Sequence, residues 1–196
     1  LTNKVYSAGE LVPALECLGA VANGTAQMGH DAAYYHTGKS EGCAFFTAFP
    51  FGFTMGEMAA WIKHGNGQKL WDELYAPFGI RGFQAGSTGT QMFGWFRREI
   101  RSLADLDGLK FRTPGNQGRV LQKLGVTPVS LPGGEIFPAL QSGAIDGAEW
   151  VGPYNDLALG FYQVCRYYYS PGYHEPGPAL QLTVNEQAWR SLPSDL

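Results

Sequence analysis

The sequence predicts an α/β protein built on two small sheets, and three observations lead to that class. From about residue 80, segments that read as strands alternate with segments that read as helices, a pattern typical of helices packed on sheets. Hydrophobic residues make up 44% of the chain and aromatic residues 14%, which is enough for a sizeable core. No apolar run approaches the roughly 20 residues of a membrane-spanning helix. The alternation favours mainly parallel sheets, and two sheets joined by crossing strands fit better than one.

The first 80 residues predict helices separated by one strand and one irregular segment. Leucine and valine recur at helical spacing over residues 10–23, and Asn23–Gly24 is a helix stop signal. Residues 26–35 predict a short strand that leads into a loop. Residues 42–55 are apolar and aromatic but are broken by a proline and two glycines, which favours the wall of a cleft or a domain-packing loop. Two helices are expected next, over 56–65 and 68–79.

The rest of the chain predicts short strands and helices in turn. A capping-box pattern at Ser102 and Asp105 precedes a strand-like LKFR stretch, and Gly125 closes a clear helix. Strands are expected over 79–86, 90–96, 109–112, 127–131, 144–150, 164–169 and 181–185. Helices are expected over 115–125, 133–143 and 152–161, and from residue 186 onward.

Composition excludes several functional classes. Lys and Arg number 14 against 17 Asp and Glu, so the net charge is −3, and the ample apolar material excludes a disordered chain. We expect no nucleic-acid partner, because basic residues cluster only at Arg97, Arg98 and Arg101, which read as an exposed helix face. The three cysteines lie far apart in the sequence and do not settle the redox compartment.

The sequence carries no familiar catalytic motif. Its glycine-rich segments lack the GK[ST] end of a phosphate-binding loop and the GxGxxG pattern, so turns explain them better. Neither a GxSxG nucleophile motif nor an HExxH metal motif occurs. The histidines are each more typical of a core or surface histidine than of a metal ligand: His30, His36, His64 and His174.

Isolated polar residues near predicted strand ends are the candidates for a binding site. Arg112 ends a strand just before a helix, which suits a bidentate grip on a carboxylate, although a surface salt bridge would also explain it. Glu149 follows an apolar strand and needs an arginine or a cation if it is buried. Gln91 offers an oxygen for a hard cation, and Glu175 offers another or is simply exposed in a turn. Ligands collect at strand ends, so Gln91, Arg112 and Glu149 form a testable set.

Several stretches resemble one family of receptors. They are TGTQMFGWFRREI, DLDGLKFRTPG, the segment from Gly118 to Tyr162, and YYYSPGYHEPGP, with AYYHTGKSEGCAFFTAFPFG matching more loosely. Together they resemble the solute-binding subunits of tripartite ATP-independent periplasmic (TRAP) transporters, in the branch that binds 2-oxo acids and lactate. The most specific part is SGAIDGAEWVGPYND, whose Glu149–Trp150 pair separates this branch from the binders of dicarboxylates and sugar acids.

The resemblance implies a class II periplasmic-binding-protein fold, in which two α/β domains with mixed sheets are hinged around a cleft. We assign residues 1–84 and 152–178 to domain I, and residues 85–151 and 179–196 to domain II. A periplasmic location follows from the family. Relatives carry a signal peptide, a first strand and a long C-terminal segment, so both ends of this sequence are expected to be cuts through a longer protein.

The resemblance also implies roles for individual residues. Arg112 would clamp the ligand carboxylate, and sodium or calcium would bridge protein and ligand. The cation ligands would be Gln91, Glu149, the carbonyl of Trp150 and Glu175. An apolar rim would cover the ligand, with candidates Tyr35, Phe49, Trp150, Tyr154 and Tyr173. Tyr173–His174 stands where some relatives carry tryptophans, so the pocket size is expected to differ.

These expectations describe a receptor and not an enzyme. It would capture a small 2-oxo or 2-hydroxy monocarboxylate such as pyruvate and deliver it to the membrane subunits of the transporter, and a homodimer is a further candidate assembly. One alternative is a metal-dependent small-molecule enzyme that uses Glu149 as a base beside Arg112. Another is the same receptor fold with a dicarboxylate or an aromatic acid as its ligand.

Overall fold

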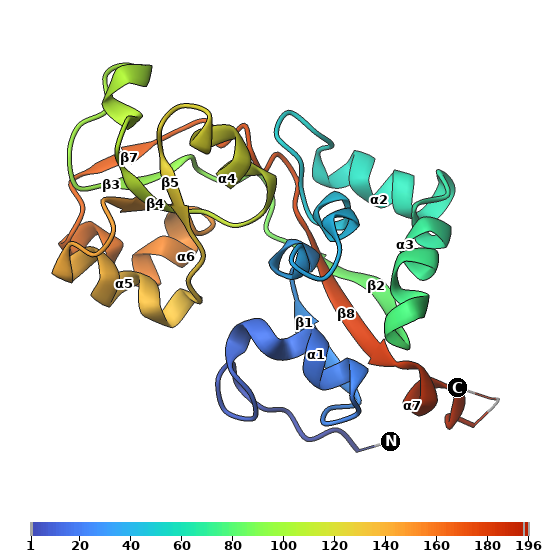
Figure 1. Cartoon of the computed structure of the whole chain (residues 1–196). Coiled ribbons are helices and arrows are strands. Elements are labelled where there is room, and N and C mark those ends of the chain that lie inside the picture. Colours follow the sequence, from blue (N-terminus) through green and yellow to red (C-terminus); the bar gives the residue numbers. More distant parts are fainter. Residues whose placement is uncertain (1, 194, 196) are drawn as a thin grey trace.

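The computed structural model describes residues 2–193 and 195 and consists of two lobes, each built on its own sheet (Figure 1). The first lobe holds a three-stranded sheet in the order β1 (Met28–Asp31), β8 (Ala179–Asn185) and β2 (Ile80–Ser87). The second lobe holds a five-stranded sheet in the order β5, β4, β6, β3 and β7. Its strands are β3 (Gly94–Phe96), β4 (Lys110–Arg112), β5 (Thr127–Val129), β6 (Gly147–Ala148) and β7 (Tyr167–Tyr169).

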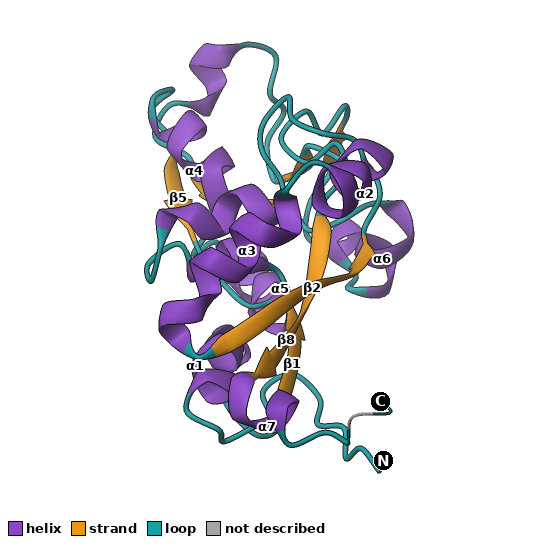
Figure 2. Ribbon diagram, turned by 90° about the vertical axis from the view of Figure 1, so that its right-hand side faces the viewer, coloured by secondary structure: helices purple, strands orange, loops and turns teal. Residues whose placement is uncertain are grey.

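Helices cover the sheet of the first lobe. The helix α1 (Cys17–Ala22) packs on β1 and β8, and α3 (Gly67–Tyr75) packs on β2, as Figure 2 shows. The helix α2 (Met55–His64) begins at a capping box formed by Thr54 and Glu57. A last short helix, α7 (Glu186–Arg190), follows β8 directly. The core between these elements includes Leu18, Val21, Trp71, Tyr75 and Ile80.

The second lobe has two apolar clusters around its sheet. The helices are α4 (Gly115–Gln122), α5 (Gly133–Ser142) and α6 (Pro153–Ala158). One cluster includes Phe96, Phe111 and Leu121, and the other includes Ile136, Leu140 and Phe161. Most predicted helices and strands are present within a few residues of their expected bounds. Among the described residues, every helix is too short or too polar to cross a membrane.

The strand directions correct the prediction of mainly parallel sheets. In the first lobe β8 runs antiparallel to both β1 and β2. In the second lobe β4 is parallel to β5 and β6, whereas β3 is antiparallel to β6 and β7. The reason is that the chain passes between the lobes twice, so β8 enters the first sheet from outside and not through a helical crossover within that sheet.

Sheet membership is also the reverse of the predicted division after residue 151. β7 lies within 152–178, which was assigned with the first lobe, but it pairs with β3 in the second. β8 lies within 179–196, which was assigned with the second lobe, but it is the central strand of the first. Alternate residues of β8 are buried, including Ala179, Gln181 and Thr183, because helices of the first lobe pack on one face of the sheet.

Two connections run side by side between the lobes and position the site. One joins β2 to β3, and the other joins β7 to β8. The backbone N–H of Gln91 donates to the backbone carbonyl of Glu175 at 3.0 Å, and the Thr90 hydroxyl donates to the backbone carbonyl of Pro176 at 2.8 Å. A Cβ at position 172 would collide with the Gln91 carbonyl, so only glycine permits this approach. The two connections are therefore held as a pair.

Candidate functional site

Four polar side chains that the sequence singled out are buried together where the two lobes meet. Arg112 is the last residue of β4, and Glu149 follows β6 immediately. Gln91 and Glu175 lie on the two connections between the lobes. The exposed fraction of each residue is 3% or less. The structure therefore contradicts the readings of Arg112 as a surface salt bridge and of Glu149 and Glu175 as exposed carboxylates.

Arg112 and Glu149 form a buried ion pair. Nη1 of Arg112 donates to Oε1 of Glu149 at 2.7 Å and to its backbone carbonyl at 2.9 Å, while Nε donates to the Leu131 carbonyl at 3.1 Å. A guanidinium has five donor hydrogens, so the two on Nη2 lie outside these three bonds. The Trp150 ring lies 5.2 Å from the guanidinium carbon and covers one of its faces. Arg112 is thus fixed in orientation, and its Nη2 is not used by Glu149 or Leu131.

Two tyrosines of the first lobe reach this pair. The 3-10 turn Ala33–His36 carries Tyr34 and Tyr35, and it packs against α4 of the second lobe. Burial raises the pKa of the Tyr35 hydroxyl, and nearby Arg112 opposes that rise. Burial also raises the pKa of Tyr34, and the charge of Glu175 adds to it. Sequence reasoning chose Tyr35 and missed Tyr34; the Tyr-Tyr pair was the available signal, because a tight turn can present successive side chains to one site.

Three oxygen atoms at this place have no hydrogen-bond partner among residues 2–193 and 195. They are Oε1 of Gln91, Oε2 of Glu149 and Oε2 of Glu175. The side-chain nitrogen Nε2 of Gln91 donates to the Thr88 hydroxyl at 3.0 Å. This bond fixes the side-chain amide, so that its Oε1 faces away from Thr88. Burial raises the pKa of Glu175 well above its ordinary range, and the charge of Glu149 raises it further. Converging, unpartnered oxygens are the donor set of a hard cation, so these residues fit a sodium or calcium ion.

His174 joins the same cluster, which sequence reasoning did not anticipate. It is 1% exposed, and its Nε2 lies 3.7 Å from Oε2 of Glu149. Glu149, His174 and Glu175 each offer one ligand atom, and these atoms all lie within 4.8 Å of one another. In the sequence, only the adjacent candidate ligand Glu175 pointed to His174, because Glu149 is far away along the chain.

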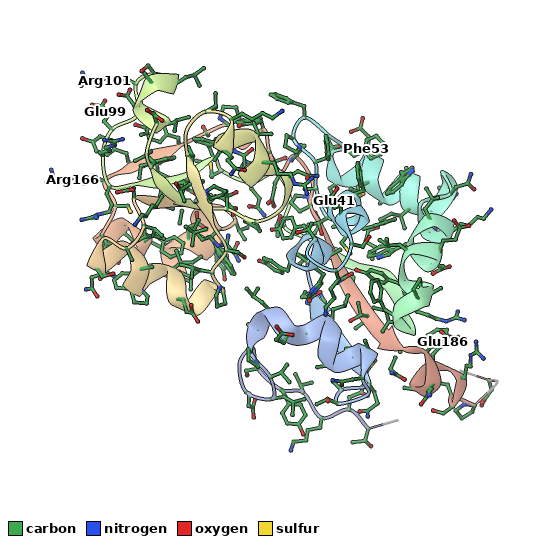
Figure 3. The ribbon with its side chains drawn as sticks, viewed as in Figure 1. Glu41, Phe53, Glu99, Arg101, Arg166 and Glu186 are labelled. Atoms are coloured by element: carbon green, nitrogen blue, oxygen red, sulfur yellow. The ribbon has the colours of Figure 1, made fainter. Side chains whose placement is uncertain are left out.

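Of the five residues predicted for the apolar rim, three lie near the buried cluster and two do not. Trp150 and Tyr35 lie against Arg112, and Tyr173 stacks on Phe93 while its hydroxyl accepts a bond from Gln117 at 3.2 Å. Tyr154, by contrast, is 88% exposed on the first turn of α6. Phe49 stacks on exposed Phe45, in the same loop as Phe53 of Figure 3. In the described part of the chain, no hydrogen bond or ring contact joins Phe49 or Tyr154 to the buried cluster.

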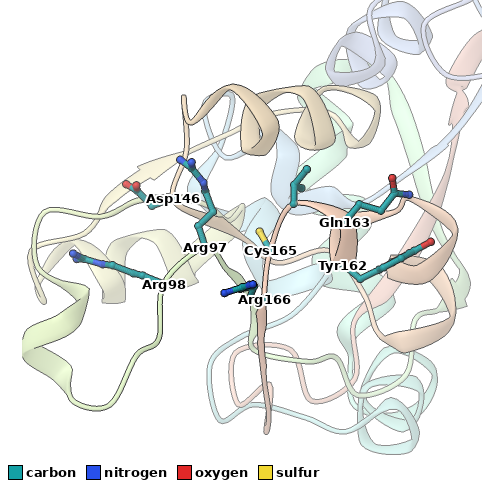
Figure 4. A pocket seen from close by; sticks show the side chains of 8 residues that line it. Arg97, Arg98, Asp146, Tyr162, Gln163, Cys165 and Arg166 are labelled. Carbon is teal, nitrogen blue, oxygen red and sulfur yellow. The ribbon is translucent and has the colours of Figure 1, made fainter.

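A hollow of about 550 Å³ lies on the second lobe and is lined by residues outside this cluster (Figure 4). Its lining includes Arg97, Arg98 and Arg166, all exposed, and the carboxylate of Asp146. Arg97, Arg98 and Arg101 were predicted to lie on an exposed helix face. They are exposed, but they lie in a loop after β3, because the chain turns there before the capping box at Ser102.

Comparisons with known proteins agree on one family. The sequence profile of the bacterial extracellular solute-binding protein family 7 (DctP) matches residues 1–196. A monocarboxylate 2-oxoacid-binding periplasmic protein of Nostoc sp. strain PCC 7120 is 50% identical over 190 residues, which cover 97% of this chain and 52% of that protein. The chain therefore spans about half the length of this relative.

Two solved structures are similar as well. A TRAP transporter solute-binding protein from Bordetella bronchiseptica RB50 superposes with a TM-score of 0.95 at 44% identity, covering 97% of this chain and 57% of that one. It is a mixed-occupancy dimer, with copurified calcium and picolinate in one active site and an apo site. A TRAP periplasmic solute-binding protein from Pseudoalteromonas atlantica T6c, with bound sodium and pyruvate, gives a TM-score of 0.90 at 48% identity, covering 93% and 55%. The profile match over the whole chain, together with these likenesses, shows that the chain belongs to the DctP family of bacterial extracellular solute-binding proteins.

Proposed function

We propose that the protein is a receptor for a small 2-oxo or 2-hydroxy monocarboxylate such as pyruvate, and that it serves a TRAP transporter. One observation carries the proposal. A buried arginine, whose Nη2 donors lie outside its bonds to Glu149 and Leu131, lies beside a buried set of oxygens that have no hydrogen-bond partner among the described residues. That arrangement suits a ligand with a carboxylate at one end and a carbonyl or hydroxyl oxygen next to it.

In this proposal Arg112 takes the ligand carboxylate through Nη2, while Glu149 holds the guanidinium in place. Gln91, Glu149, Glu175 and the carbonyl of Trp150 would hold sodium or calcium. The cation would offset the charge of the second carboxylate, which otherwise repels an anionic ligand. The relatives support this pairing, since the Pseudoalteromonas protein holds sodium with pyruvate and the Bordetella protein holds calcium with picolinate.

Tyr35, Trp150 and Tyr173 form the apolar cover of the proposed site, with Tyr34 added. Among residues 2–193 and 195, Phe49 and Tyr154 make no hydrogen bond or ring contact that supports the rim role predicted for them. Both lobes supply residues, so the ligand would stabilise their closed arrangement, and the transporter's membrane subunits would recognise that shape. The family and the Nostoc relative support an extracytoplasmic, periplasmic place of action. The Bordetella dimer supports a homodimer as the assembly.

A planar aromatic acid is the second candidate ligand. The Bordetella relative holds picolinate, and the rings of Trp150 and Tyr173 offer apolar surface of the right kind. Competition between picolinate and pyruvate in one titration would rank the two.

Calorimetric titration tests the proposal. The ligand-stripped protein is titrated with pyruvate in buffers that contain only potassium, added sodium or added calcium. We expect saturable heat at one ligand per chain that requires sodium or calcium. No heat in any buffer, from protein shown to be folded by circular dichroism, would contradict the proposal.

A further inference from the structure

A chain of buried hydrogen bonds lies in the first lobe, next to the 3-10 turn Ala33–His36. Nε2 of His36 donates to Oδ2 of Asp31 at 2.6 Å, and Nε2 of Gln181 donates to Oδ1 of Asp31 at 2.6 Å. The Tyr75 hydroxyl donates to Oε1 of Gln181 at 2.7 Å. The side chains of His36 and Asp31 are 2% and 8% exposed, and Gln181 and Tyr75 are fully buried. Breaking one of these bonds would leave a buried polar group without its partner, so the chain of bonds is rigid.

The bond between His36 and Asp31 closes the turn. Asp31 is the last residue of β1, and His36 is the last residue of the 3-10 turn. Tyr34 and Tyr35 lie between them, and the backbone N–H of Tyr34 donates to the hydroxyl of buried Thr47 at 3.1 Å. A 3-10 turn this short has few hydrogen bonds of its own, so these side chains fix its place in the lobe.

The turn and its bonds lie between two parts of the proposed ligand site. On one side, the Tyr34 ring lies against the start of α4, because a Cβ on Gly115 would be 2.8 Å from Cδ2 of the ring. Gly115 comes shortly after Arg112 in the chain. On the other side, Gln181 lies on β8, the strand that follows the connection carrying Glu175. The hydrogen bonds therefore join the turn to the strand that leads from a proposed cation ligand.

We propose that Asp31 and His36 are positioning residues for ligand binding. They hold the two tyrosines of the turn where the ligand and Arg112 meet them when the lobes close. Among residues 2–193 and 195, no hydrogen bond, ion pair or ring contact joins Asp31 or His36 to Arg112, so they act through the tyrosines. A turn that is ordered before the ligand arrives lowers the free-energy cost of binding. The inference rests on the proposed receptor function and adds to it residues that lie behind the tyrosines.

Substitution of His36 tests the proposal, with pyruvate affinity measured by calorimetry in the presence of calcium. His36→Leu leaves Oδ2 of Asp31 without its partner, and we expect pyruvate binding at least about tenfold weaker. His36→Gln places a donor nitrogen near the position of Nε2, so its affinity should stay within about threefold of the wild type. Ile62→Ala is the matched control, because it removes a buried side chain from α2 of the same lobe. It should lower stability without weakening pyruvate binding.

A double-mutant cycle separates positioning from a general loss of stability. The loss caused by His36→Leu should shrink by at least about threefold in a Tyr34→Phe or a Tyr35→Phe background, because a hydroxyl that is already absent cannot be misplaced. Wild-type affinity in His36→Leu would overturn the proposal, and so would a loss of the same size in both tyrosine backgrounds. If His36→Leu fails to fold, Asp31→Asn takes its place in the same cycle, since it keeps the shape of the side chain and removes its charge.

The wild type separates this proposal from the proposed function. Heat from the wild type, together with unchanged affinity in His36→Leu, removes the positioning role and leaves the receptor standing. No heat from the wild type in any buffer removes the receptor, and with it the positioning role that rests on it.

Discussion

Arg112 combines a structural role with the ligand-binding role proposed for it. Its Nη1 and Nε hydrogens bond to Glu149 and to the Leu131 carbonyl, so the guanidinium cannot turn away from the site. Removing one partner of a buried pair leaves the other charge uncompensated, which is more costly than losing the pair as a whole. The Nη2 donors, which the proposal assigns to the ligand carboxylate, are therefore held in a single orientation.

Arg112→Ala should abolish or strongly weaken pyruvate binding, by roughly 2–5 kcal/mol, because a desolvated carboxylate would lose its charged partner. It should also destabilise the fold, since Glu149 would stay buried beside Glu175 without a cation. Calorimetry measures the first effect and thermal unfolding the second. Arg98→Ala is the control, because Arg98 is exposed on the second lobe. Wild-type affinity in Arg112→Ala would remove Arg112 from the site.

The candidate site could be predicted residue by residue only in part. Their places near strand ends and turns, and their side-chain chemistry, explained why Gln91, Arg112, Glu149 and Glu175 were worth choosing. The resemblance to receptors then implied which of them clamps the ligand and which hold the cation. His174 could not be found this way, because its place in the cluster depends on the distance to Glu149, which only the fold determines. Tyr154 fails for the opposite reason: an aromatic residue beside a predicted site can still face solvent.

At the scale of elements, local patterns predicted the helices and strands well but not their partners. The capping box predicted at Ser102 and Asp105 is present, and in the structure it begins the 3-10 turn Leu103–Leu106. Strand pairing depends on contacts far apart in the chain, so the local sequences of β7 and β8 do not show which sheet each strand joins. The placement of β7 in the second lobe and β8 in the first follows from burial and from the paired connections. Local sequence patterns contain neither of these.

Gly172→Ala tests the paired connections. A Cβ at this position would collide with the carbonyl of Gln91, so the two segments must separate and the bonds between them must weaken. We expect a loss of stability of about 1–3 kcal/mol and weaker ligand binding. Gly56→Ala is the matched control: its Cβ would meet no atom within 4 Å, and alanine favours the helix α2. Chemical denaturation of both variants measures the difference, and equal stability would contradict the close approach.

The stability that the junction of β2 with α7 contributes should depend on pH. Arg81 and Arg190 both donate to the Glu186 carboxylate, with shortest distances of 2.7 and 2.8 Å, and Arg81 lowers the pKa of Glu186 most, to about 2 from an ordinary value of 4.5. Because the folded pKa is the lower one, the stabilisation is complete above about pH 4.5 and is lost as the pH falls toward 2.

Glu186→Gln should therefore cost less than about 1 kcal/mol at neutral pH, since the pair is partly solvated, and should flatten the fall in stability between pH 4.5 and 2. Urea denaturation at a series of pH values gives the profile. Glu73→Gln, in the exposed pair with Lys69, is the control that should leave the profile unchanged. A profile with the same acid slope in Glu186→Gln would rule out this carboxylate as its source.

At the scale of the whole molecule, the two lobes touch through polar contacts at the edge of the site. Arg119 on α4 pairs with Glu41 of the first lobe, whose position Figure 3 shows, and Gln117 on the same helix donates to the Tyr173 hydroxyl. Both partners of the Arg119–Glu41 pair are largely exposed. Such an exposed pair joins the lobes weakly and reversibly, which suits the opening and ligand release of the proposed receptor.

Arg119→Ala should shift the protein toward an open arrangement in the absence of ligand, without removing any group that contacts the ligand. The radius of gyration from small-angle X-ray scattering should rise for the ligand-free variant and return to the wild-type value with saturating ligand. Affinity for pyruvate should fall by a small factor that shrinks as salt rises, because salt screens the exposed pair in the wild type. Lys69→Ala, which breaks an exposed pair within α3, is the matched control. A ligand-free radius of gyration equal to that of the wild type would show that closure depends on the buried contacts of Tyr34 and Tyr35 and not on this pair.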